Sequence, residues 1–283
     1  MPIENEYLTL PNLYTQGKTY RFVYREFGNK NGVPLVLLPH LSATLDNWDP
    51  LLMNHLAARH WVIVFDNVGV GLSDGTVPKT IAAMAEGVLE FLDSLELDQV
   101  DLLGLSMGGM VAQELVTKAP DRVRKLILVG TGPRGGTGIR NVTKISNIEL
   151  VRSLFTFKDV KTYLFFTATK NGRVKAAEFL DRLKARKVVK DKGIRLMSYL
   201  NQLTAINRWG KNTPADLSGI QQETLIVNGD HDRMVPTENS YDLAERIPNT
   251  KLKIYYDAGH GSLFQFPVEF SELVSAFLDE NLI

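Results

Sequence analysis

The sequence predicts an α/β fold in which a mainly parallel, doubly wound sheet carries an inserted helical cap. Short apolar runs alternate with longer amphipathic runs in both end regions of the chain, which is the pattern of a parallel sheet covered by helices on both faces. Between about residues 139 and 210 this alternation stops, and the sequence favours helices with no convincing buried strand. We therefore predict a core of residues 1–133 and 217–283 and a cap of residues 134–216.

The charge distribution separates the same two regions. The formal net charge of the chain is zero. Residues 134–211, however, contain 18 Lys and Arg against 5 Asp and Glu, a balance of +13, and the remainder carries the opposite balance of −13. Two regions of such different character indicate an inserted subdomain.

The individual core elements follow from local composition. Residues 19–27 are rich in β-branched and aromatic side chains and precede a turn at residues 29–32, so they predict a strand. Residues 34–38 and 61–65 read as buried strands with a helical stretch around residues 48–58 between them. The further predicted elements are helices at 80–95 and 107–119 and strands at 100–105, 125–129, 224–228 and 251–256.

Composition limits the class of protein. With 44% hydrophobic and 23% charged residues, the chain is typical of a globular protein with a sizeable core. The absence of cysteine excludes disulfides, thiolate metal sites and a cysteine nucleophile. We expect no secretory signal, because the first ten residues hold no apolar run. No stretch approaches the roughly 20 apolar residues that span a bilayer, and the net charge does not point to nucleic acid, so we expect a cytoplasmic protein.

Residues 104–108 read Gly-Leu-Ser-Met-Gly and match G-x-S-x-G between a predicted strand and a predicted helix. A sharp turn there would expose the hydroxyl of Ser106, and Gly104 and Gly108 would avoid collisions across it. The helix that begins at Met107 directs its positive end at the serine, and the Met107 N–H can donate to an oxyanion. We predict that Ser106 is a catalytic nucleophile.

This motif and the order of elements around it resemble the α/β-hydrolase fold superfamily, and the resemblance covers essentially the whole chain. It is similar to esterases and to cofactor-free, haloperoxidase-like serine hydrolases, and residues 41–50 and 65–75 resemble a subgroup of bacterial hydrolases. The resemblance implies a triad in the chain order Ser, acid, His. It disfavours dehalogenases and epoxide hydrolases, which place an aspartate where Ser106 stands.

His260 is the predicted base. It follows the last predicted strand within the sequence Asp-Ala-Gly-His-Gly, which is similar to the family's histidine loop. A histidine of near-neutral pKa can take the proton of a serine hydroxyl. His40 is the main competitor, because it follows the strand at residues 34–38. We expect His40 to line the pocket without acting as the base.

Asp232 is the predicted acid. The stretch that begins at Gly229 resembles the family loop G-x-x-D-x-x-V-P, which assigns Asp232, with Asp230 as the alternative. A buried carboxylate there would hold His260 in the right tautomer and stabilise the imidazolium. The run Asp-His-Asp has no further ligands at recognisable spacing, so we predict no metal site.

The oxyanion hole is predicted to use the N–H groups of Met107 and Leu41. The family usually has His-Gly after the third strand, and the residue after that glycine donates. Here Pro39-His40-Leu41 stands at this place, so the assignment to Leu41 is open by one residue either way. Residues 130–135 formally match G-x-G-x-x-G, but no helix begins on them, so we interpret them as a hinge into the cap and expect no cofactor.

The cap combines aromatic and basic side chains. Its aromatic residues could roof an apolar pocket, with Trp209 as a candidate, or form the cap's own core; they are Phe155, Phe157, Tyr163, Phe165, Phe166 and Trp209. Basic residues such as Arg182, Lys184, Arg186, Lys187 and Lys190 are usually a solvated face. We also hypothesise that they attract an anionic ligand or partner to the cap.

Together these features predict a carboxylesterase-like serine hydrolase that cleaves a carboxylic ester or lactone through an acyl-enzyme on Ser106. The same triad also serves carbon–carbon bond hydrolases and perhydrolases, because the fold does not fix the reaction. A hydrolase-like receptor that binds a small molecule with little turnover is a further alternative. The sequence does not identify the substrate.

Overall fold

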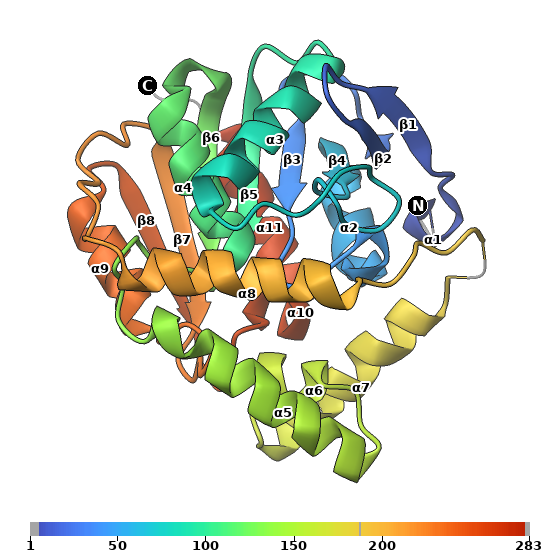
Figure 1. Cartoon of the computed structure of the whole chain (residues 1–283), viewed down its shortest axis with the longest axis vertical. Helices are drawn as coiled ribbons and strands as arrows, with labels where there is room; N and C mark the ends of the chain where they lie inside the picture. The colour runs from blue at the N-terminus through green and yellow to red at the C-terminus, as the bar shows by residue number, and fades with distance from the viewer. Residues whose placement is uncertain (1–5, 187, 281–283) are drawn as a thin grey trace.

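The computed structural model describes residues 6–186 and 188–280, and an eight-stranded sheet forms its centre (Figure 1). The spatial order is β1-β2-β4-β3-β5-β6-β7-β8. β2 runs antiparallel to both of its neighbours, and the other adjacent pairs are parallel. The strands are β1 (Leu13–Gln16), β2 (Arg21–Gly28), β3 (Leu35–Leu38), β4 (Trp61–Phe65), β5 (Val100–Leu105), β6 (Val123–Val129), β7 (Glu223–Gly229) and β8 (Thr250–Tyr255).

Helices cover both faces of this sheet. Successive side chains of a strand point to opposite faces, and β6 illustrates the result. Leu126 and Leu128 pack in the apolar layer beneath α3, α4 and α9, whereas Ile127 and Val129 pack in the layer beneath α2 and α11. The core helices are α2 (Pro50–Ala57), α3 (Ile81–Ser94), α4 (Met107–Lys118), α9 (Glu238–Arg246) and α11 (Pro267–Asp279), and the short elements are α1 (Glu6–Thr9), α10 (Ser262–Gln265) and the 3₁₀ helices η1 (Leu45–Asn47), η2 (Pro120–Arg122) and η3 (Ile139–Asn141).

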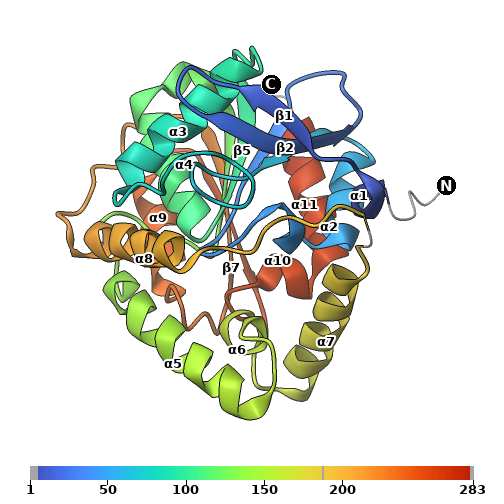
Figure 2. The same ribbon diagram turned by 45° about the vertical axis from the view of Figure 1, so that its right-hand side comes forward.

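A group of four helices follows β6 and precedes β7. These are α5 (Val142–Thr156), α6 (Lys161–Phe165), α7 (Lys170–Lys184) and α8 (Leu196–Lys211). Figures 1 and 2 show α5, α6 and α7 at the lower end of the molecule, with α8 between α5 and the core. We propose residues 134–216 as the bounds of this cap.

The predicted fold class is confirmed: the sheet is mainly parallel, is covered on both faces and is interrupted by a helical insertion. The strand β1 was not predicted. Its four residues read Leu-Tyr-Thr-Gln and alternate between half-buried and exposed positions at the edge of the sheet, so they carry little of the apolar signal that marks the central strands. No helix within residues 6–186 and 188–280 is both long and apolar enough to cross a lipid bilayer.

Candidate active site

Ser106 stands at a strained turn between β5 and α4. Its φ of 56° and ψ of −116° lie in a region that residues with a side chain rarely adopt. Two hydrogen bonds hold the turn: the Ser106 N–H donates to the Val129 carbonyl at 2.8 Å, and the Thr131 hydroxyl donates to the Ser106 carbonyl at 2.8 Å. The sheet and α4 therefore fix the backbone of Ser106 in a conformation that presents its side chain beyond the end of β5.

The two glycines of the motif are required by close backbone packing. A Cβ atom on Gly104 would lie 2.5 Å from both the Gly108 carbonyl oxygen and the Gly109 Cα atom, and one on Gly108 would collide with the Leu38 carbonyl. These obstacles are main-chain atoms, which cannot rotate away as a side chain can. The chain can therefore make this turn only with small residues at both positions.

We expect Gly104→Ala to lower the free energy of unfolding by about 1–3 kcal/mol, because the new methyl group forces the turn apart. Gly219→Ala is the matched control, since among the described residues no atom beyond those of its chain neighbours lies within 4 Å of a Cβ built there, and it should change stability by less than about 0.5 kcal/mol. Urea unfolding followed by circular dichroism measures both. Equal losses in the two variants would show that the contact at Gly104 is not the cause.

His260 and Asp232 form a buried pair. The Nδ1 atom of His260 lies 2.7 Å from Oδ2 of Asp232. The other carboxylate oxygen of Asp232 accepts hydrogen bonds from the N–H groups of Met234 and Val235, at 2.8 and 3.0 Å. Because the carboxylate is held on both sides, it fixes the orientation of the imidazole and leaves Nε2 of His260 available for chemistry.

Asp230, the alternative acid, is engaged elsewhere. Its carboxylate lies 2.6 Å from Nδ1 of His231 and accepts from the Ala258 N–H at 3.1 Å. The contact with Ala258 stabilises the loop that carries His260. Asp230 therefore supports the site through this loop and does not contact the His260 ring.

Asp257 is a residue that the sequence did not single out. It adopts a φ of 51° just before His260 in the chain, and its carboxylate accepts hydrogen bonds from Thr167 and Thr169 at 2.9 Å and from Asn171 at 3.2 Å. These three partners lie around the start of α7, so the histidine loop is fastened to the cap. The only signal in the sequence was the position of Asp257 within the histidine loop.

The two N–H groups predicted for the oxyanion hole are those of Met107 and Leu41. Neither the Met107 nor the Leu41 N–H donates to an acceptor within the part of the chain that the structure describes. Met107 opens α4, so its N–H belongs to the unpaired first turn of a helix. The loop after Leu41 is held by the cap, since the Ser42 N–H donates to Oε1 of Gln202 at 2.8 Å.

His40 is a neutral residue that stabilises the loop of Leu41. Its Nδ1 lies 2.7 Å from the Leu41 carbonyl oxygen, and its ring packs edge-on against Phe165 with centroids 4.8 Å apart. Burial lowers the pKa of His40 to about 3. The Leu41 carbonyl therefore accepts a hydrogen bond from the Nδ1–H of neutral His40. His40 is a poor candidate for a base at neutral pH.

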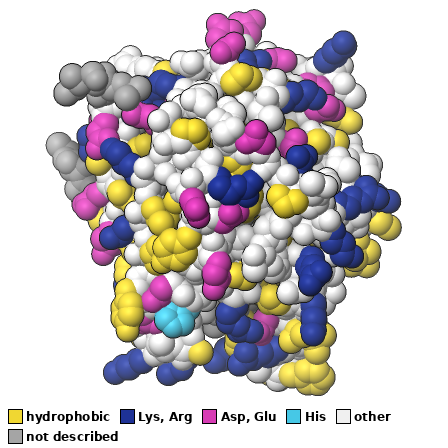
Figure 3. All heavy atoms as spheres, turned by 90° about the vertical axis from the view of Figure 1, so that its left-hand side faces the viewer, with side chains coloured by type: hydrophobic (Ala, Val, Ile, Leu, Met, Phe, Trp, Pro, Cys, Tyr) yellow, Lys and Arg dark blue, Asp and Glu magenta, His cyan; other side chains and the backbone are white. Residues whose placement is uncertain are grey.

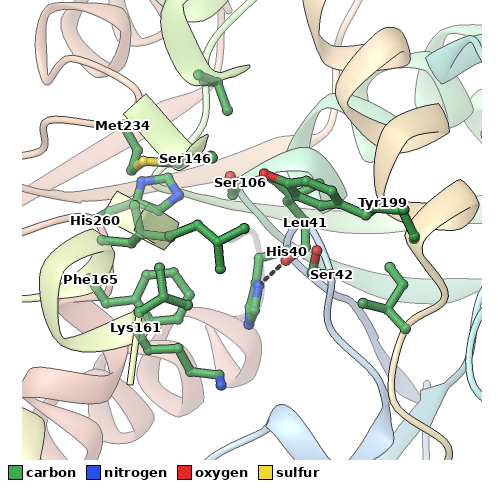
Figure 4. Close-up of a pocket in the computed structure, with 16 residues that line it drawn as sticks. His40, Leu41, Ser42, Ser106, Ser146, Lys161, Phe165, Tyr199, Met234 and His260 are labelled. Atoms are coloured by element: carbon green, nitrogen blue, oxygen red, sulfur yellow. Dashed lines mark hydrogen bonds between the residues drawn. The ribbon is translucent and has the colours of Figure 1, made fainter. Parts of the chain in front are cut away.

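Ser106, His260 and His40 line one cavity of about 420 Å³ (Figure 4). The close-up shows Ser106 between His260 on one side and Tyr199 on the other. The lining is mostly apolar, and it consists of His40, Leu41, Ser42, Ser106, Val142, Ser146, Leu150, Val160, Lys161, Leu164, Phe165, Ile194, Leu196, Tyr199, Met234 and His260.

The expectation that Trp209 lines this cavity is wrong. Trp209 is buried at the end of α8, and its indole N–H donates to the Gly132 carbonyl at 3.2 Å. This hydrogen bond connects the last turn of α8 to the segment of residues 130–135 that follows β6. The cavity is instead lined by residues at the beginning of α8, Leu196 and Tyr199.

Comparison with known proteins decides the family. The sequence model of the alpha/beta hydrolase fold matches residues 33–267. The chain belongs to the α/β-hydrolase fold family. This hydrolase is 36% identical to an alpha/beta hydrolase fold protein from Chitinophaga pinensis, with a TM-score of 0.92 over 98% of this chain and all of the other.

Two further relatives of this hydrolase have named activities. It is 29% identical to the 2-hydroxy-6-oxononadienedioate/2-hydroxy-6-oxononatrienedioate hydrolase of Escherichia coli, over 94% of each chain. It is 26% identical to Est816, described as an N-acyl homoserine lactone degrading enzyme, with a TM-score of 0.74 over 94% of this chain and all of the other. The chain is therefore a hydrolase, and the named relatives act on different compounds.

The sequence suggested that the basic residues of the hydrolase cap form a solvated face, but some of them are buried or paired. Arg182 makes a bidentate salt bridge with the buried carboxylate of Asp49, with N···O distances of 2.8 and 2.6 Å. Lys184 is exposed and lies 3.3 Å from Asp181. Lys190 is also exposed, and Lys187 lies outside the described residues.

Arg186 is the most deeply buried of these cations, with 3% of its surface exposed. It donates to the carbonyl groups of Tyr7 and Leu10 at 2.9 and 2.7 Å, and its Nε lies 3.3 Å from Asp46. Arg25 of β2 contacts the same Asp46 carboxylate at 2.7 Å. Part of the basic excess of the cap thus serves to attach it to the core.

Asp66 and Asp191 are two carboxyl groups placed against each other where the segment between α7 and α8 meets the core. Asp66 accepts from the Leu45 and Leu72 N–H groups at 3.0 and 3.2 Å, and the two carboxyls lie so close together that a Cβ on Gly71 would meet both. Burial, with the neighbouring Asp191 adding to it, raises the pKa of Asp66 well above its usual range. The folded hydrolase therefore holds a proton in this pair more tightly than the unfolded chain does.

This raised pKa predicts a loss of stability at higher pH. The stabilisation is fully present below about pH 4, the ordinary carboxyl value, and is lost as the pH rises toward the raised value. Asp191→Asn replaces one carboxyl by an amide that can donate to ionised Asp66. We expect this variant to gain about 1–3 kcal/mol relative to the wild type between pH 4 and pH 8. Urea unfolding across this range measures the difference, and a difference independent of pH would contradict the prediction.

Proposed function

We propose that this hydrolase cleaves a carboxylic ester or lactone through an acyl-enzyme on Ser106. The observation that carries the proposal is the 2.7 Å contact between His260 and Asp232 at a cavity that also contains the strained Ser106. The N–H groups of Met107 and Leu41, which have no acceptor among the described residues, complete the set of groups that acyl transfer requires.

In the proposed mechanism, the Ser106 oxygen attacks the carbonyl carbon while its proton passes to Nε2 of His260. The Met107 and Leu41 N–H groups donate to the carbonyl oxygen as it gains negative charge. The carbon–oxygen bond to the alcohol then breaks, and the departing oxygen takes the proton from His260. Water attacks the acyl-enzyme by the same route, giving up a proton to His260, which returns it to Ser106 as the acid leaves. Asp232 orients His260 throughout and stabilises the imidazolium that forms.

The cavity lining supports an acyl group that is mainly apolar. Its walls are formed by aliphatic and aromatic side chains such as Val142, Leu164 and Met234. Lys161 is the only Lys or Arg among the described lining residues, and its Nζ lies 3.4 Å from each carboxylate oxygen of Asp159, too far for a strong pair. The basic residues of the cap led us to expect an anionic ligand. We propose that this anion is a carboxylate at the far end of the acyl chain and that Lys161 binds it.

Lys161→Met is expected to change the preference for such esters. The ratio of kcat/KM for a p-nitrophenyl ester with a terminal carboxylate to kcat/KM for its neutral analogue should fall about 5-fold, because a half-exposed ion pair contributes up to about 1 kcal/mol. Lys158→Met, which removes an exposed cation outside the cavity lining, is the matched control. An unchanged ratio in the Lys161 variant would refute the role of Lys161 and leave the ester mechanism standing.

Hydrolysis of a carbon–carbon bond is the second candidate, and the 29% identity to the Escherichia coli enzyme favours it. The name of that enzyme's substrate describes a dicarboxylate. Among the described lining residues of the present cavity, Lys161 is the only Lys or Arg. One of the two carboxylates of such a substrate would therefore lack a cationic partner. A buried unpaired carboxylate is costly, so the cavity supports the ester or lactone better.

Labelling with a fluorophosphonate, followed by intact mass, tests for an activated serine. A single adduct is expected, and peptide mapping should place it on Ser106. Turnover of p-nitrophenyl esters and lactones, compared with turnover of a 2-hydroxy-6-oxo-dienoate, then separates the two reactions. Faster cleavage of the dienoate would overturn the ester proposal in favour of the second candidate. Absence of any adduct on folded protein would overturn both and favour a receptor.

A further inference from the structure

The outer surface of α5 is apolar and exposed. Ile148, Val151 and Phe155 follow one another at helical spacing and are between 52% and 80% exposed, and Leu154 is 68% exposed. Phe157, which ends the helix, is 96% exposed. The expectation that Phe155 and Phe157 would roof a pocket or fill the cap core is therefore wrong, and these large side chains meet solvent.

The beginning of α8 extends this surface beside α5. Leu196 and Met197 are 72% and 62% exposed, and the Tyr199 hydroxyl on α8 donates to Asn147 on α5 at 2.9 Å. Leu150 of α5 and Leu196 are exposed and also line the catalytic cavity. The apolar surface therefore adjoins the mouth of that cavity through Leu150 and Leu196, and we call it the cap collar. It consists of Ile148, Leu150, Val151, Leu154, Phe155, Phe157, Leu196, Met197 and Leu200.

Exposed cations lie on the same segments of the chain as the collar residues. They are Lys144, Arg152, Lys158, Lys190, Lys192 and Arg195. The acidic residues of the same segments do little to offset them. Glu149 is buried between Arg233 at 2.9 Å and Arg152 at 3.4 Å, so of these cations it offsets Arg152. Asp191 lies against Asp66 in the core, which leaves Asp159 as the exposed carboxylate of these segments. Figure 3 shows yellow hydrophobic and dark blue basic side chains together at the lower end of the molecule, where the cap lies.

We propose that the cap collar docks on an anionic lipid surface, with the mouth of the catalytic cavity facing the membrane. Apolar side chains surrounded by Lys and Arg are the combination that binds the interface of an anionic bilayer. An exposed apolar surface of this extent is unusual for a face that meets only water. A second copy of the chain fits this surface less well, because a two-fold contact would bring the same cations together.

Sedimentation of the full chain with lipid vesicles tests the proposal. Vesicles of phosphatidylcholine containing about 30 mol% phosphatidylglycerol should bind the protein at least about tenfold more tightly than vesicles of phosphatidylcholine alone, and added salt should weaken the binding. Equal binding to both vesicles, or binding to neither, would overturn the proposal.

Two triple variants separate the apolar and the ionic contributions. Leu154→Ser with Phe155→Ser and Phe157→Ser should reduce binding to the anionic vesicles at least about tenfold, whereas Tyr256→Ser, at a site 84% exposed on the core, should not. Lys144→Gln with Lys158→Gln and Lys192→Gln should also reduce binding, whereas the same charge change on the core, at Lys18, Lys30 and Lys79, should have little effect.

The apolar variants also distinguish this proposal from the proposed function. Leu154, Phe155 and Phe157 lie outside the cavity lining, so hydrolysis of soluble p-nitrophenyl acetate should be unchanged in the triple variant. Its loss together with vesicle binding would indicate a damaged fold, which circular dichroism checks. A concentration-dependent dimer in sedimentation velocity that the apolar triple variant abolishes would assign the collar to a second copy and overturn the lipid proposal.

Discussion

Replacing Ser106 with alanine is expected to lower kcat for ester hydrolysis by roughly 10⁶-fold, the scale seen when the nucleophile of a serine hydrolase is removed. The reason is that no acyl-enzyme can form without the Ser106 oxygen, while the N–H groups of Met107 and Leu41 still polarise the bound carbonyl. Alanine keeps the Cβ atom and the backbone hydrogen bonds to Val129 and Thr131, so the turn should fold as before.

This loss is measured by incubating each variant with a p-nitrophenyl ester for several hours and quantifying the p-nitrophenol released. Ser271→Ala is the control, because Ser271 is a buried serine on α11 whose hydroxyl donates to the Val268 carbonyl. That variant should retain kcat within about twofold, since its hydroxyl is remote from the cavity. A Ser106 variant that kept more than about a hundredth of the wild-type kcat would show that another group is the nucleophile.

Replacing Asp232 with asparagine is expected to lower kcat by about 10⁴-fold through the tautomer of His260. The oxygen of the amide can still accept from the Met234 and Val235 N–H groups, as Oδ1 does now. The amide nitrogen then faces Nδ1 of His260, where a donor requires Nδ1 to be unprotonated. The proton consequently resides on Nε2, which can no longer accept the proton of Ser106.

The effect of Asp232→Asn should appear in kcat with little change in KM, because Asp232 does not line the cavity. Asp230→Asn is the matched control, since it makes the same chemical change two residues earlier. Asp230 contacts His231 and the Ala258 N–H instead of the His260 ring, so we expect a loss below about tenfold. If Asp230→Asn were the more damaging change, the assignment of the acid would have to be reversed.

The central fold could be read from the sequence because each buried parallel strand is a short apolar run. The run at residues 125–129, for example, lies within β6, whose side chains alternate between two apolar layers. The nucleophile was recognisable for a similar reason: the glycines around Ser106 are imposed by backbone contacts that act over a few residues. Local causes leave local patterns in a sequence.

Contacts between distant parts of the chain left no such pattern. Arg186 is buried against the carbonyl groups of Tyr7 and Leu10, which lie 179 and 176 residues away in the sequence. The residues next to Arg186 in the sequence do not show these partners, so the sequence suggested an ordinary surface cation. Trp209 was misplaced because helical periodicity does not say which end of α8 reaches the cavity. The collar was missed because the sequence cannot distinguish an apolar helix face that packs from one that remains exposed.

The attachments of the cap have a consequence for how this enzyme could be altered. Gln202 of the cap supports the backbone of the loop that carries Leu41, and Arg182 neutralises Asp49 at the start of α2. A transplanted cap without a counterpart of Arg182 and Gln202 would leave Asp49 as an isolated buried charge and the loop without its amide partner. Recombination of whole caps therefore needs the core residues that receive them to be exchanged at the same time, and specificity in this scaffold should evolve more readily by single substitutions than by modular replacement.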